Sequence, residues 1–425
     1  MEEKRIIGDS KNSDEFLDSS KTQKQVFADL HIHSRYSRAC SKDITIENLV
    51  KYAKIKGLGL LGTGDFTHPL WLREIKEKLK EKDGLYYYND FPFILTGEVS
   101  LIYSQGGKGR RVHLVVLAPN TEIVDKINAY LDTRGRRDYD GRPIFNIPAD
   151  KFVEEMMKIS DKIEIIPAHA WTPWFGIFGS MSGFDSLKEA FQEQLGNIHA
   201  IETGMSSSPE MNWMISELNN KSIISFSDSH SFWPWRIGRE ATIFSSAESY
   251  DDIISAIREN KIIGTVETEP AYGKYHWDGH ANCNFSSNPE KTKEIGGICP
   301  VCGKPLTIGV ENRVEKLKNQ ESYVYPRKKP FYKLLPLHEL IALAKASTLA
   351  SRKTWLTYNL LIEKFGNEFR ILLDIGTDDL RKVLPNDELL VNLIIDNRIG
   401  KIRVKPGFDG KYGEPMLKEK QMKLE

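Results

Sequence analysis

The stretch Ala28-Asp29-Leu30-His31-Ile32-His33-Ser34 lies close to the N-terminus, and the short apolar run Gln25-Val26-Phe27-Ala28 leads into it. In a β-strand, side chains two residues apart leave the same face, so the imidazoles of His31 and His33 can reach one metal ion. Two histidines at a strand end can also be core residues whose hydrogen bonds are satisfied by their neighbours. The pair therefore predicts a metal site only in combination with further ligands.

Further candidate ligands come directly after later apolar runs of the chain. They are Glu98, His169, Asp228 and His230. Packing alone does not readily explain so many ligand-rich strand ends, so we expect these side chains to converge with the first pair. His113 begins its strand rather than ending it, but the Gly-rich segment 105–109 can form a hairpin that returns His113 beside Glu98.

Strands and helices are expected to alternate over residues 25–265. The expected strands are residues 25–28, 58–61, 93–96, 112–117, 163–167, 198–201 and 222–226. Thr45 is the expected N-cap of a helix over 46–56 that ends at Gly57, and another helix is expected over 71–82. Alternation of this kind favours a parallel sheet closed into a barrel, an α/β fold whose chemistry gathers where the strands end.

The composition is that of an ordinary globular protein. The chain has 425 residues, 40% hydrophobic and 28% charged, which suffices for a large core plus one or two smaller domains. Lys and Arg number 59, as do Asp and Glu, so the net charge predicts neither a nucleic acid nor an acidic partner. No apolar run reaches the roughly 18 residues of a membrane span. We expect a cytoplasmic protein without membrane contact, with a disordered, polar extension at residues 1–24.

The types, order and strand-end positions of these residues resemble the polymerase and histidinol phosphatase superfamily over residues 25–265. The resemblance implies a distorted seven-stranded (β/α)7 barrel that holds up to three metal ions and hydrolyses phosphoesters. The ligands that it implies are His31, His33, Asp65, His68, Glu98, His113, His169, Asp228 and His230. Two positions depart from the superfamily pattern: Phe66 follows Asp65 where many relatives have histidine, and Ala39-Cys40 replaces an acid or histidine. His68 is therefore either a ligand reached by a shifted backbone or a surface residue.

Mixed imidazole and carboxylate ligands suit zinc, manganese or iron better than a cage for magnesium alone. Two-metal sites stabilise charge on both the attacking and the leaving oxygen of a phosphodiester, so the protein needs no covalent nucleophile. We expect Glu98 to bridge the metals, and Glu98, Asp228 and Asp65 to be catalytic. The segment Gly106-Gly107-Lys108-Gly109 lacks the Ser or Thr of an ATP-binding P-loop, which disfavours an ATP-driven reaction.

A second metal site is predicted where three of the four cysteines cluster. His280 and Cys283, then Cys299 and Cys302, form two pairs with two intervening residues each, the spacing of a structural zinc knuckle. His276 is an alternative fourth ligand because it lies one turn before His280. Zinc enclosed by four ligands stabilises a fold, so this site predicts a small domain in a reducing interior rather than catalysis.

Two aromatic loops directly follow predicted metal ligands. Residues 171–179 follow His169, and residues 232–236 follow His230. Aromatic rings in loops beside a metal site are unusual for a pure core, so we expect these loops to receive a displaced base. The residues expected to do so are Trp171, Trp174, Phe175, Trp233 and Arg236.

Beyond the cysteines, residues 323–333 interleave aromatic rings with cations, including Arg327 and Lys328. Such a mixture can bind a phosphate backbone and stack on unpaired bases. The same segment also fits a solvated linker with a few packed rings.

Taken together, the barrel, the inserted finger and a helical C-terminal region resemble the endonuclease Q family. Residues 62–69 and 297–303 are the most similar to that family. The resemblance implies a DNA repair endonuclease that cuts 5′ of deaminated bases (hypoxanthine, uracil and xanthine) and of abasic sites, in double- or single-stranded DNA. We expect zinc in the finger and in the active site, magnesium or manganese as candidate activators, nucleoid association, and a replication clamp as a candidate partner.

The expected domains follow from these motifs. They are a phosphoesterase barrel over 25–268, a zinc finger over 269–312, a helical DNA-binding region over 313–417 and a charged tail over 418–425. Two other functions remain open. A small-molecule phosphatase of the histidinol phosphate type needs the barrel but has no use for the finger or the helical region. An inactive DNA-binding scaffold has no use for the set of ligands.

Overall fold

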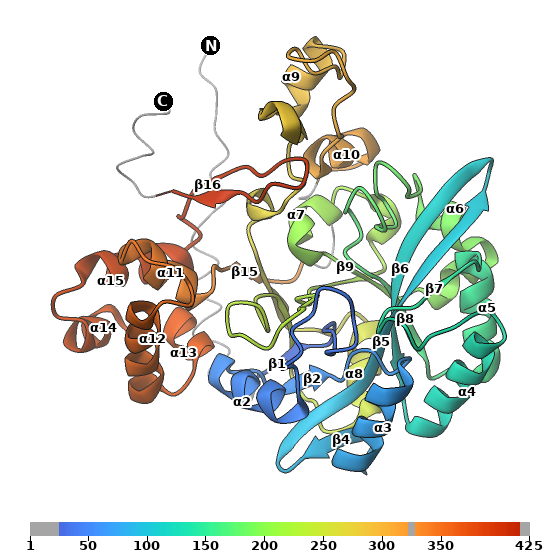
Figure 1. Ribbon diagram of the computed structural model, residues 1–425, viewed down its shortest axis with the longest axis horizontal. Helices are drawn as coiled ribbons and strands as arrows, with labels where there is room; N and C mark the ends of the chain where they lie inside the picture. The colour runs from blue at the N-terminus through green and yellow to red at the C-terminus, as the bar shows by residue number, and fades with distance from the viewer. Residues whose placement is uncertain (1–24, 322–327, 417–425) are drawn as a thin grey trace.

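The computed structural model describes residues 25–321 and 328–416, and a sheet of eleven strands runs through its centre (Figure 1). The strands are β1 Val26–Asp29, β2 Leu60–Gly62, β3 Lys80–Lys82, β4 Leu85–Tyr88, β5 Phe91–Gln105, β6 Lys108–Ala118, β7 Ile144–Phe145, β8 Glu164–Pro167, β11 Ala241–Phe244, β12 Gly264–Glu267 and β15 Phe331–Lys333. Their hydrogen-bonded order is β15-β12-β11-β1-β2-β5-β4-β3, with β6 and β7 beside β5 and β8 beside β6. The predictions for residues 1–24, Arg327 and residues 418–425 lie outside the described residues.

The first crossover of the sheet forms as the sequence predicts. Helix α2, Ile46–Lys56, begins after Thr45, whose hydroxyl accepts a backbone N–H of the first turn, and it ends at Gly57 with φ of 99°. The helix returns the chain so that β2 pairs in parallel with β1, with Ala28 opposite Leu60. The predicted cap, helix bounds and two strands are confirmed.

The next helix is shorter than the expected 71–82. Helix α3, Pro69–Lys78, ends where Leu79 adopts an extended backbone, and the following residues form the exposed strand β3, which pairs antiparallel with β4. The prediction was wrong beyond Lys78. The polar sequence Lys80-Glu81-Lys82 has low β-propensity. The signal that could have found this hairpin is the turn Asp83-Gly84, both residues of which have positive φ.

A long hairpin of β5 and β6 extends across the molecule (Figure 1). The two strands pair antiparallel from Leu95 opposite Ala118 to the turn at residues 105–108. This register places Nδ1 of His113 2.8 Å from Oε1 of Glu98. The predicted hairpin is confirmed, and it makes the sheet mixed rather than all parallel.

Two further strands bring the remaining candidate ligands to the same place. Strands β9, Ala200–Glu202, and β10, Ser222–Ile224, pair in parallel as a separate two-stranded sheet. Beyond β8, the N–H of Ala170 donates to the carbonyl of Glu202 at 2.9 Å, and beyond β1 the N–H of His33 donates to the carbonyl of Ser229 at 2.9 Å. The carboxyl ends of β1, β8, β9 and β10 therefore meet.

Helices cover the sheet and enclose an apolar core (Figure 1). Those between the strands are α4 Thr121–Asp132, α5 Ala149–Ile159, α6 Leu187–Phe191, α7 Pro209–Asn212 and α8 Tyr250–Arg258, with short 3-10 helices at Gln192–Asn197, Gly204–Ser206, Ser216–Leu218, Pro270–Tyr272 and Ala281–Cys283. The largest fully buried rings include Trp71, Phe93, Phe145 and Phe152. Among the described residues, none of the helices has the length and apolar character needed to span a bilayer.

The chain leaves the sheet after β12 and returns to it at β15, which pairs in parallel with β12. The intervening elements are β13 Asp278–His280, β14 Phe285–Ser287, α9 Pro289–Glu294 and α10 Val310–Leu317. Five helices then form a separate lobe, namely α11 Leu337–Ala344, α12 Arg352–Phe365, α13 Glu368–Leu373, α14 Thr377–Val383 and α15 Glu388–Arg398. The chain next returns to the finger in a hairpin of β16, Val404–Lys405, and β17, Glu414–Pro415, where Trp277 and Phe408 form a bridge.

Candidate functional site

Six predicted ligands converge at the carboxyl ends of the strands. The donor atoms of His31, His33, Glu98 and Asp228 lie within 4.8 Å of one another, as do those of Glu98, His113 and His169. We call these six residues the central cluster. Glu98 belongs to both groups: its Oε2 lies 3.4 Å from Nε2 of His31 and 3.2 Å from Nε2 of His33, and its Oε1 faces His113. A carboxylate shared in this way can bridge two cations.

The first two histidines are held in the orientation that metal binding requires. Nδ1 of His31 lies 3.0 Å from both carboxylate oxygens of Glu202, and Nδ1 of His33 lies 2.9 Å from Oδ1 of Asp65. A carboxylate at one ring nitrogen fixes the tautomer that leaves the other nitrogen free to bind a metal. Nε2 of His31 is buried in the cluster without a hydrogen-bond partner in the described residues. The donor set therefore fits metal ions.

Two more histidines follow the same pattern. Nδ1 of His169 lies 3.0 Å from the hydroxyl of Thr172, which leaves Nε2 at 3.3 Å from Oε1 of Glu98. Nδ1 of His230 lies 2.9 Å from the carbonyl of Asp228, and its ring lies 4.5 Å from that of His33, between centroids. His230 thus lies at the edge of the central cluster, outside both four- and three-residue groups.

Charged neighbours within the cluster shift the pKa values of Glu98 and His31 in the direction opposite to the effect of burial. Burial alone would raise the pKa of the Glu98 carboxyl, but His113, Arg142 and His31 hold that pKa well below its ordinary value. Burial also opposes the charged form of His31, yet Glu202 and Glu98 raise its pKa well above the ordinary value. For His113, burial dominates and lowers the pKa to about 4. The site therefore keeps its carboxylates ionised and available to cations.

Three predicted residues have left-handed backbones, which non-glycine residues rarely adopt. The φ angles are 45° at Asp65, 30° at His169 and 48° at Asp228. Such conformations cost free energy, on the order of 1–3 kcal/mol each, and they cluster at functional sites. Each marks a sharp turn that directs a side chain into the centre.

Besides His230, two of the implied ligands lie outside both groups, namely Asp65 and His68. Asp65 contacts the cluster through His33, and its Oδ2 accepts the backbone N–H of Ser34 at 2.6 Å and the hydroxyl of Ser37 at 2.9 Å. His68 stacks on Tyr36 with ring centroids 4.4 Å apart, and its Nε2 lies 3.2 Å from the carbonyl of Asp138. Asp65 is thus placed to orient a ligand, and His68 is held away from the cluster.

Sequence reasoning missed two residues of the site. Glu202 directly follows the predicted strand 198–201 and is the partner of His31, so the strand-end acid that indicated other residues could have found it. Arg142 lies in the loop between α4 and β7, and its Nη1 donates to Oε2 of Glu98 at 3.0 Å. A loop arginine carries no signal in the sequence that separates it from a surface cation.

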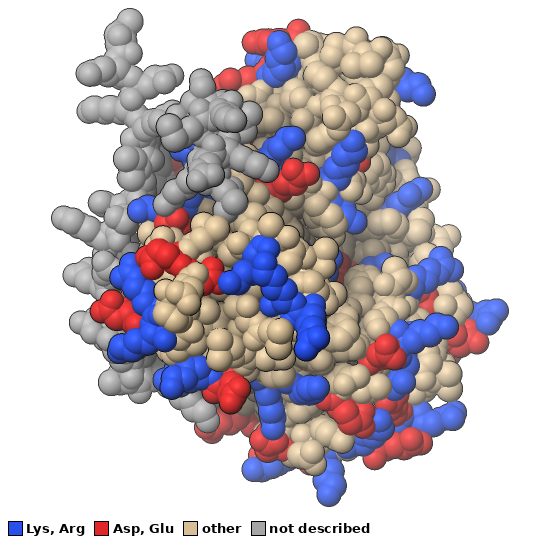
Figure 2. All heavy atoms as spheres, turned by 60° about the vertical axis from the view of Figure 1, so that its left-hand side comes forward, with Lys and Arg blue, Asp and Glu red and all other residues tan. Residues whose placement is uncertain are grey.

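A cavity of about 820 Å³ opens beside the cluster. His113, His169, Asp228 and His230 lie in its wall, together with the predicted Trp174, Phe175 and Arg236 and with Arg239, Lys274, Tyr275 and Tyr412. Trp174 packs edge-on against Tyr275, at 5.6 Å between ring centroids, and Phe175 lies 4.3 Å from the ring of His113. Figure 2 shows a hollowed face on which Lys and Arg mix with Asp and Glu, in keeping with the zero net charge.

Two of the predicted base-binding tryptophans are elsewhere. Trp171 is fully buried; its Nε1–H donates to Asn212 at 2.7 Å, so it belongs to the core. Trp233 stacks on Trp235 with 5.3 Å between centroids and contacts Trp355 of α12 at 5.8 Å. The prediction was wrong for Trp171, because a loop beside a site can place a ring in the core. Trp233 is partly exposed and packs against the helical lobe, so base binding by Trp233 stays a prediction.

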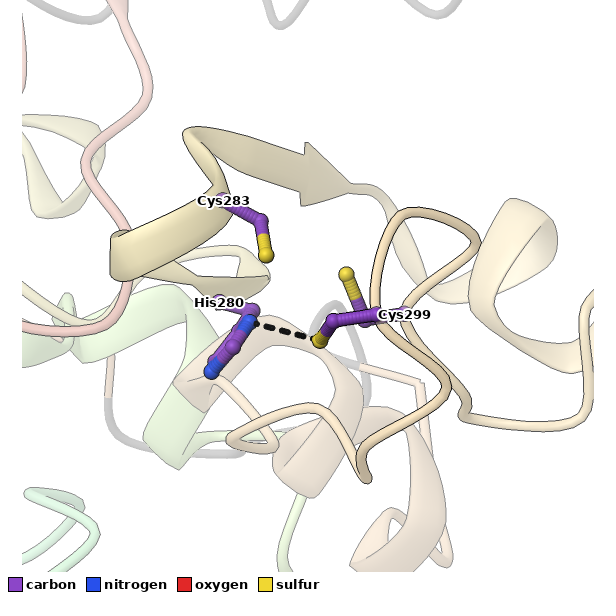
Figure 3. Close-up of side chains that lie close together, drawn as sticks. His280, Cys283 and Cys299 are labelled. Carbon is purple, nitrogen blue, oxygen red and sulfur yellow. Dashed lines mark hydrogen bonds between the residues drawn. The ribbon is translucent and has the colours of Figure 1, made fainter.

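The second metal group forms as predicted. The donor atoms of His280, Cys283, Cys299 and Cys302 lie within 4.8 Å of one another, and we call these residues the finger cluster. Figure 3 shows the labelled His280, Cys283 and Cys299 turned toward one another. Although burial opposes it, the backbone N–H groups of residues 301 and 302 lower the pKa of the Cys299 thiol to about 7, which favours the metal-binding thiolate. The alternative ligand His276 faces Glu311 instead, at 3.8 Å.

The predicted cation Lys328 is exposed, and its Nζ lies 5.6 Å from the ring centre of Trp213. Its predicted neighbour Arg327 lies outside the described residues. Lys328 lies three residues before β15 and packs on Trp213, so this end of the segment contacts the fold.

The fold and the central cluster define a class: α/β proteins with a buried histidine and carboxylate centre, extended by a Cys3His finger. Within that class, the chain belongs to the endonuclease Q family. It is 31% identical to the lesion-specific endonuclease PfuEndoQ from Pyrococcus furiosus, whose crystal structure superimposes with a TM-score of 0.83 over 94% of this chain and 97% of that one. A crystal structure of endonuclease Q with a 27-mer duplex that carries an abasic lesion at the active site is 32% identical, with a TM-score of 0.84 over 93% and 98% of the two chains.

Further similarity covers separate parts of the chain. Residues 336–401, which comprise α11–α15, match the family described as the MJ0043 C-terminal domain. Over 260 residues, or 60% of its length, the chain is 32% identical to the uncharacterized protein MJ0043 from Methanocaldococcus jannaschii. The aligned part is 32% of that protein, so the chain spans about a third of the length of this relative.

Proposed function

We propose that this protein is a DNA repair endonuclease that hydrolyses the phosphodiester 5′ of deaminated bases (hypoxanthine, uracil and xanthine) and of abasic sites. The observation that carries the proposal is the pair of donor groups that share Glu98 beside an open cavity. The cavity, about 820 Å³, is within the range of pockets that hold a small ligand or a nucleotide. The similarity to a lesion-specific endonuclease supports the choice of substrate.

The central cluster and His230 are the proposed metal ligands, with zinc as the preferred ion and magnesium or manganese as candidate activators. Bound ions would supply positive charge to the attacking and leaving oxygens of the phosphodiester. Glu202 and Asp65 keep His31 and His33 in the binding tautomer. In this arrangement Glu98 and Asp228 are the catalytic carboxylates, and Asp65 acts by orienting a ligand. We interpret the surrounding strands as a distorted seven-stranded barrel.

The cavity wall suits a base that has left the DNA stack. Trp174 and Phe175 offer aromatic faces, while Arg236 and Lys274 offer cations for phosphates. Extruding a base costs a few kcal/mol, and less when the base pairs poorly, as a deaminated base does. Selectivity for lesions would therefore arise partly from the DNA itself. In the same proposal the finger cluster binds zinc, and the finger and helical lobe contact the DNA on either side.

One gel experiment tests this function against the alternatives. Labelled duplexes that contain one deoxyinosine, one deoxyuridine or one abasic site are incubated with the protein and magnesium, manganese or zinc, beside a phosphomonoester control. We expect a single nick 5′ of each lesion that leaves a 3′-hydroxyl and a 5′-phosphate. Release of phosphate from the monoester alone would favour a small-molecule phosphatase, and a mobility shift without cutting would favour a DNA-binding scaffold.

A further inference from the structure

The loop between α4 and β7 packs against Asp65, beside the central cluster. A Cβ added to Gly141 would overlap a carboxylate oxygen of Asp65, so only glycine allows this close approach. The N–H of Gly141 donates to the carbonyl of Tyr36 at 3.2 Å, and its carbonyl accepts from the hydroxyl of Thr67 at 2.9 Å. These contacts fix the backbone on both sides and direct the next side chain, Arg142, toward the cluster.

Arg142 places a permanent cation beside the shared carboxylate. Its Nη1 donates to Oε2 of Glu98 at 3.0 Å, and its side chain is 25% exposed. Within the described residues, Nε and Nη2 of Arg142 donate to no protein group, and they are not among the buried atoms without partners. The guanidinium therefore holds Glu98 with one nitrogen and keeps donors accessible to a ligand.

A guanidinium at this position opposes metal binding, because it repels cations and competes with them for Glu98. An anion bound between the guanidinium and the metal ions would be attracted to both and would offset their mutual repulsion. The planar guanidinium matches two oxygens of a phosphate through parallel hydrogen bonds, which a carboxylate-bound lysine could not reproduce. We propose that Arg142 is a catalytic residue that donates hydrogen bonds to a non-bridging oxygen of the scissile phosphodiester. This inference rests on the proposed function.

The step that Arg142 assists is the addition of water to phosphorus. The bond from phosphorus to the 3′-oxygen breaks, one proton of the water reaches the departing oxygen, and the products are a 3′-hydroxyl and a 5′-phosphate. Negative charge on the non-bridging oxygens must be stabilised as the water adds, and hydrogen bonds from a fixed guanidinium strengthen at that moment. Arg142 should therefore raise the rate of the chemical step more than it tightens DNA binding.

The test compares Arg142→Gln and Arg142→Lys in full-length protein, with Arg136→Gln as the control. Arg136 lies in the same loop, is 76% exposed and pairs with Asp138. Single-turnover cutting of an abasic duplex should slow about 100-fold in Arg142→Gln, the usual cost of removing one donor to a developing oxyanion. Arg142→Lys should recover part of this rate, and the control should cut like the wild type. DNA affinity should stay within about twofold in all three variants, and none of them should bind less metal than the wild type, because removal of Arg142 removes a competing cation.

Phosphorothioate substrates give a readout that a structural role would not change. Sulfur is a poor hydrogen-bond acceptor, so wild-type protein should cut one phosphorothioate diastereomer at the scissile position more slowly than the other. Arg142→Gln should lose the part of the diastereomer preference that comes from the hydrogen bond to Arg142, and Arg136→Gln should keep the full preference.

Four outcomes would contradict either the role of Arg142 or the proposed function. Wild-type rates in Arg142→Gln, or a slower rate accompanied by lost metal and an unchanged diastereomer preference, would overturn the role of Arg142. Should Arg142→Gln fail to fold, a diastereomer preference in Arg142→Lys identical to the wild type would overturn it as well. If the wild-type protein itself cuts no lesion, the proposed function is what fails.

Discussion

The finger cluster and the central cluster hold similar numbers of ligands but are built in opposite ways. The finger ligands lie between residues 280 and 302, within one small sheet and its adjoining turns, and Cys302 is exposed. The central cluster draws on residues from His31 to Asp228 and is almost wholly buried. A local site is specified by spacing alone, whereas a distributed site exists only when the whole sheet has folded. Mutations in the central cluster should therefore affect cutting, whereas mutations in the finger cluster should affect zinc content and DNA binding.

The largest expected effect comes from Asp228→Ala. This change removes a carboxylate that lies 3.0 Å from His33 in the central cluster, so the barrier to hydrolysis should rise by several kcal/mol, or roughly a thousand-fold in rate. DNA binding should stay close to normal, because the finger and the helical lobe are untouched. Single-turnover cutting and a filter-binding assay measure the two quantities, with the exposed Asp251→Ala on α8 as the control. Undiminished cutting would remove Asp228 from the active site.

The next effect concerns a residue that supports the central cluster without joining it. In Glu202→Gln, the neutral amide no longer stabilises the orientation and basicity of His31, and metal affinity should fall about 10- to 100-fold. Excess metal should restore cutting, which distinguishes this variant from Asp228→Ala. Activity measured against metal concentration checks the prediction, with the exposed Glu193→Gln as the control. A loss that metal does not rescue would mean that Glu202 acts on the reaction itself.

A smaller effect is expected from Cys299→Ser in the finger cluster. The variant should lose one equivalent of zinc and bind DNA several-fold more weakly, on the order of 1 kcal/mol, while keeping the single-turnover rate at saturating protein. Zinc analysis and a titration of the cutting rate against protein concentration measure both. Val301→Ser changes the same turn and spares all four ligands. If Cys299→Ser slowed the saturated rate as strongly as Asp228→Ala, the two clusters would not be independent.

The smallest effect on cutting is expected at Glu267, a buried carboxyl with no imidazole beside it. Burial raises the pKa of Glu267 from 4.5 to about 8 and also raises that of its neighbour Glu240, so the folded pair holds protons that the unfolded chain releases at neutral pH. The stabilising contribution of Glu267 is therefore complete below pH 4.5 and is lost as the pH rises through 8, by up to about 1.4 kcal/mol per pH unit. Glu267→Gln should flatten this dependence while leaving cutting nearly unchanged, as urea unfolding at pH 5, 6.5 and 8 can measure. Equal slopes in both proteins would show that Glu267 is ionised in the fold.

The parts predicted from the sequence are those fixed by neighbouring residues. The cap at Thr45, the end of α2 at Gly57 and the hairpin between Glu98 and His113 depend on local backbone preferences that the sequence states directly. Five of the six central ligands were found because they follow apolar runs, and His113 was found because a Gly-rich segment predicts the hairpin that returns it to Glu98. Strand β3 was missed because its sequence Lys80-Glu81-Lys82 is polar and has low β-propensity, although its partner β4 follows directly after a two-residue turn.

Side-chain environments could not be predicted in the same way. Trp171 and Trp174 lie three residues apart in one loop, yet the first is core and the second lines the cavity. Arg142 enters the site only because Gly141 packs against Asp65, a contact between residues 76 positions apart in the sequence (141 minus 65). Such placements are set by the three-dimensional packing of loops, for which the sequence offers no periodic signal.

The finger is an insertion between two strands that pair with each other at one edge of the sheet. Strand β12 precedes it and β15 follows it, with Thr265 opposite Phe331 and Glu267 opposite Lys333. A protease that nicks the chain once inside this excursion would leave two fragments still held together by the sheet. Because Tyr275 lines the cavity and Arg313 donates to the carbonyls of Phe178 and Phe184, such a nicked protein should also keep the finger docked beside the site.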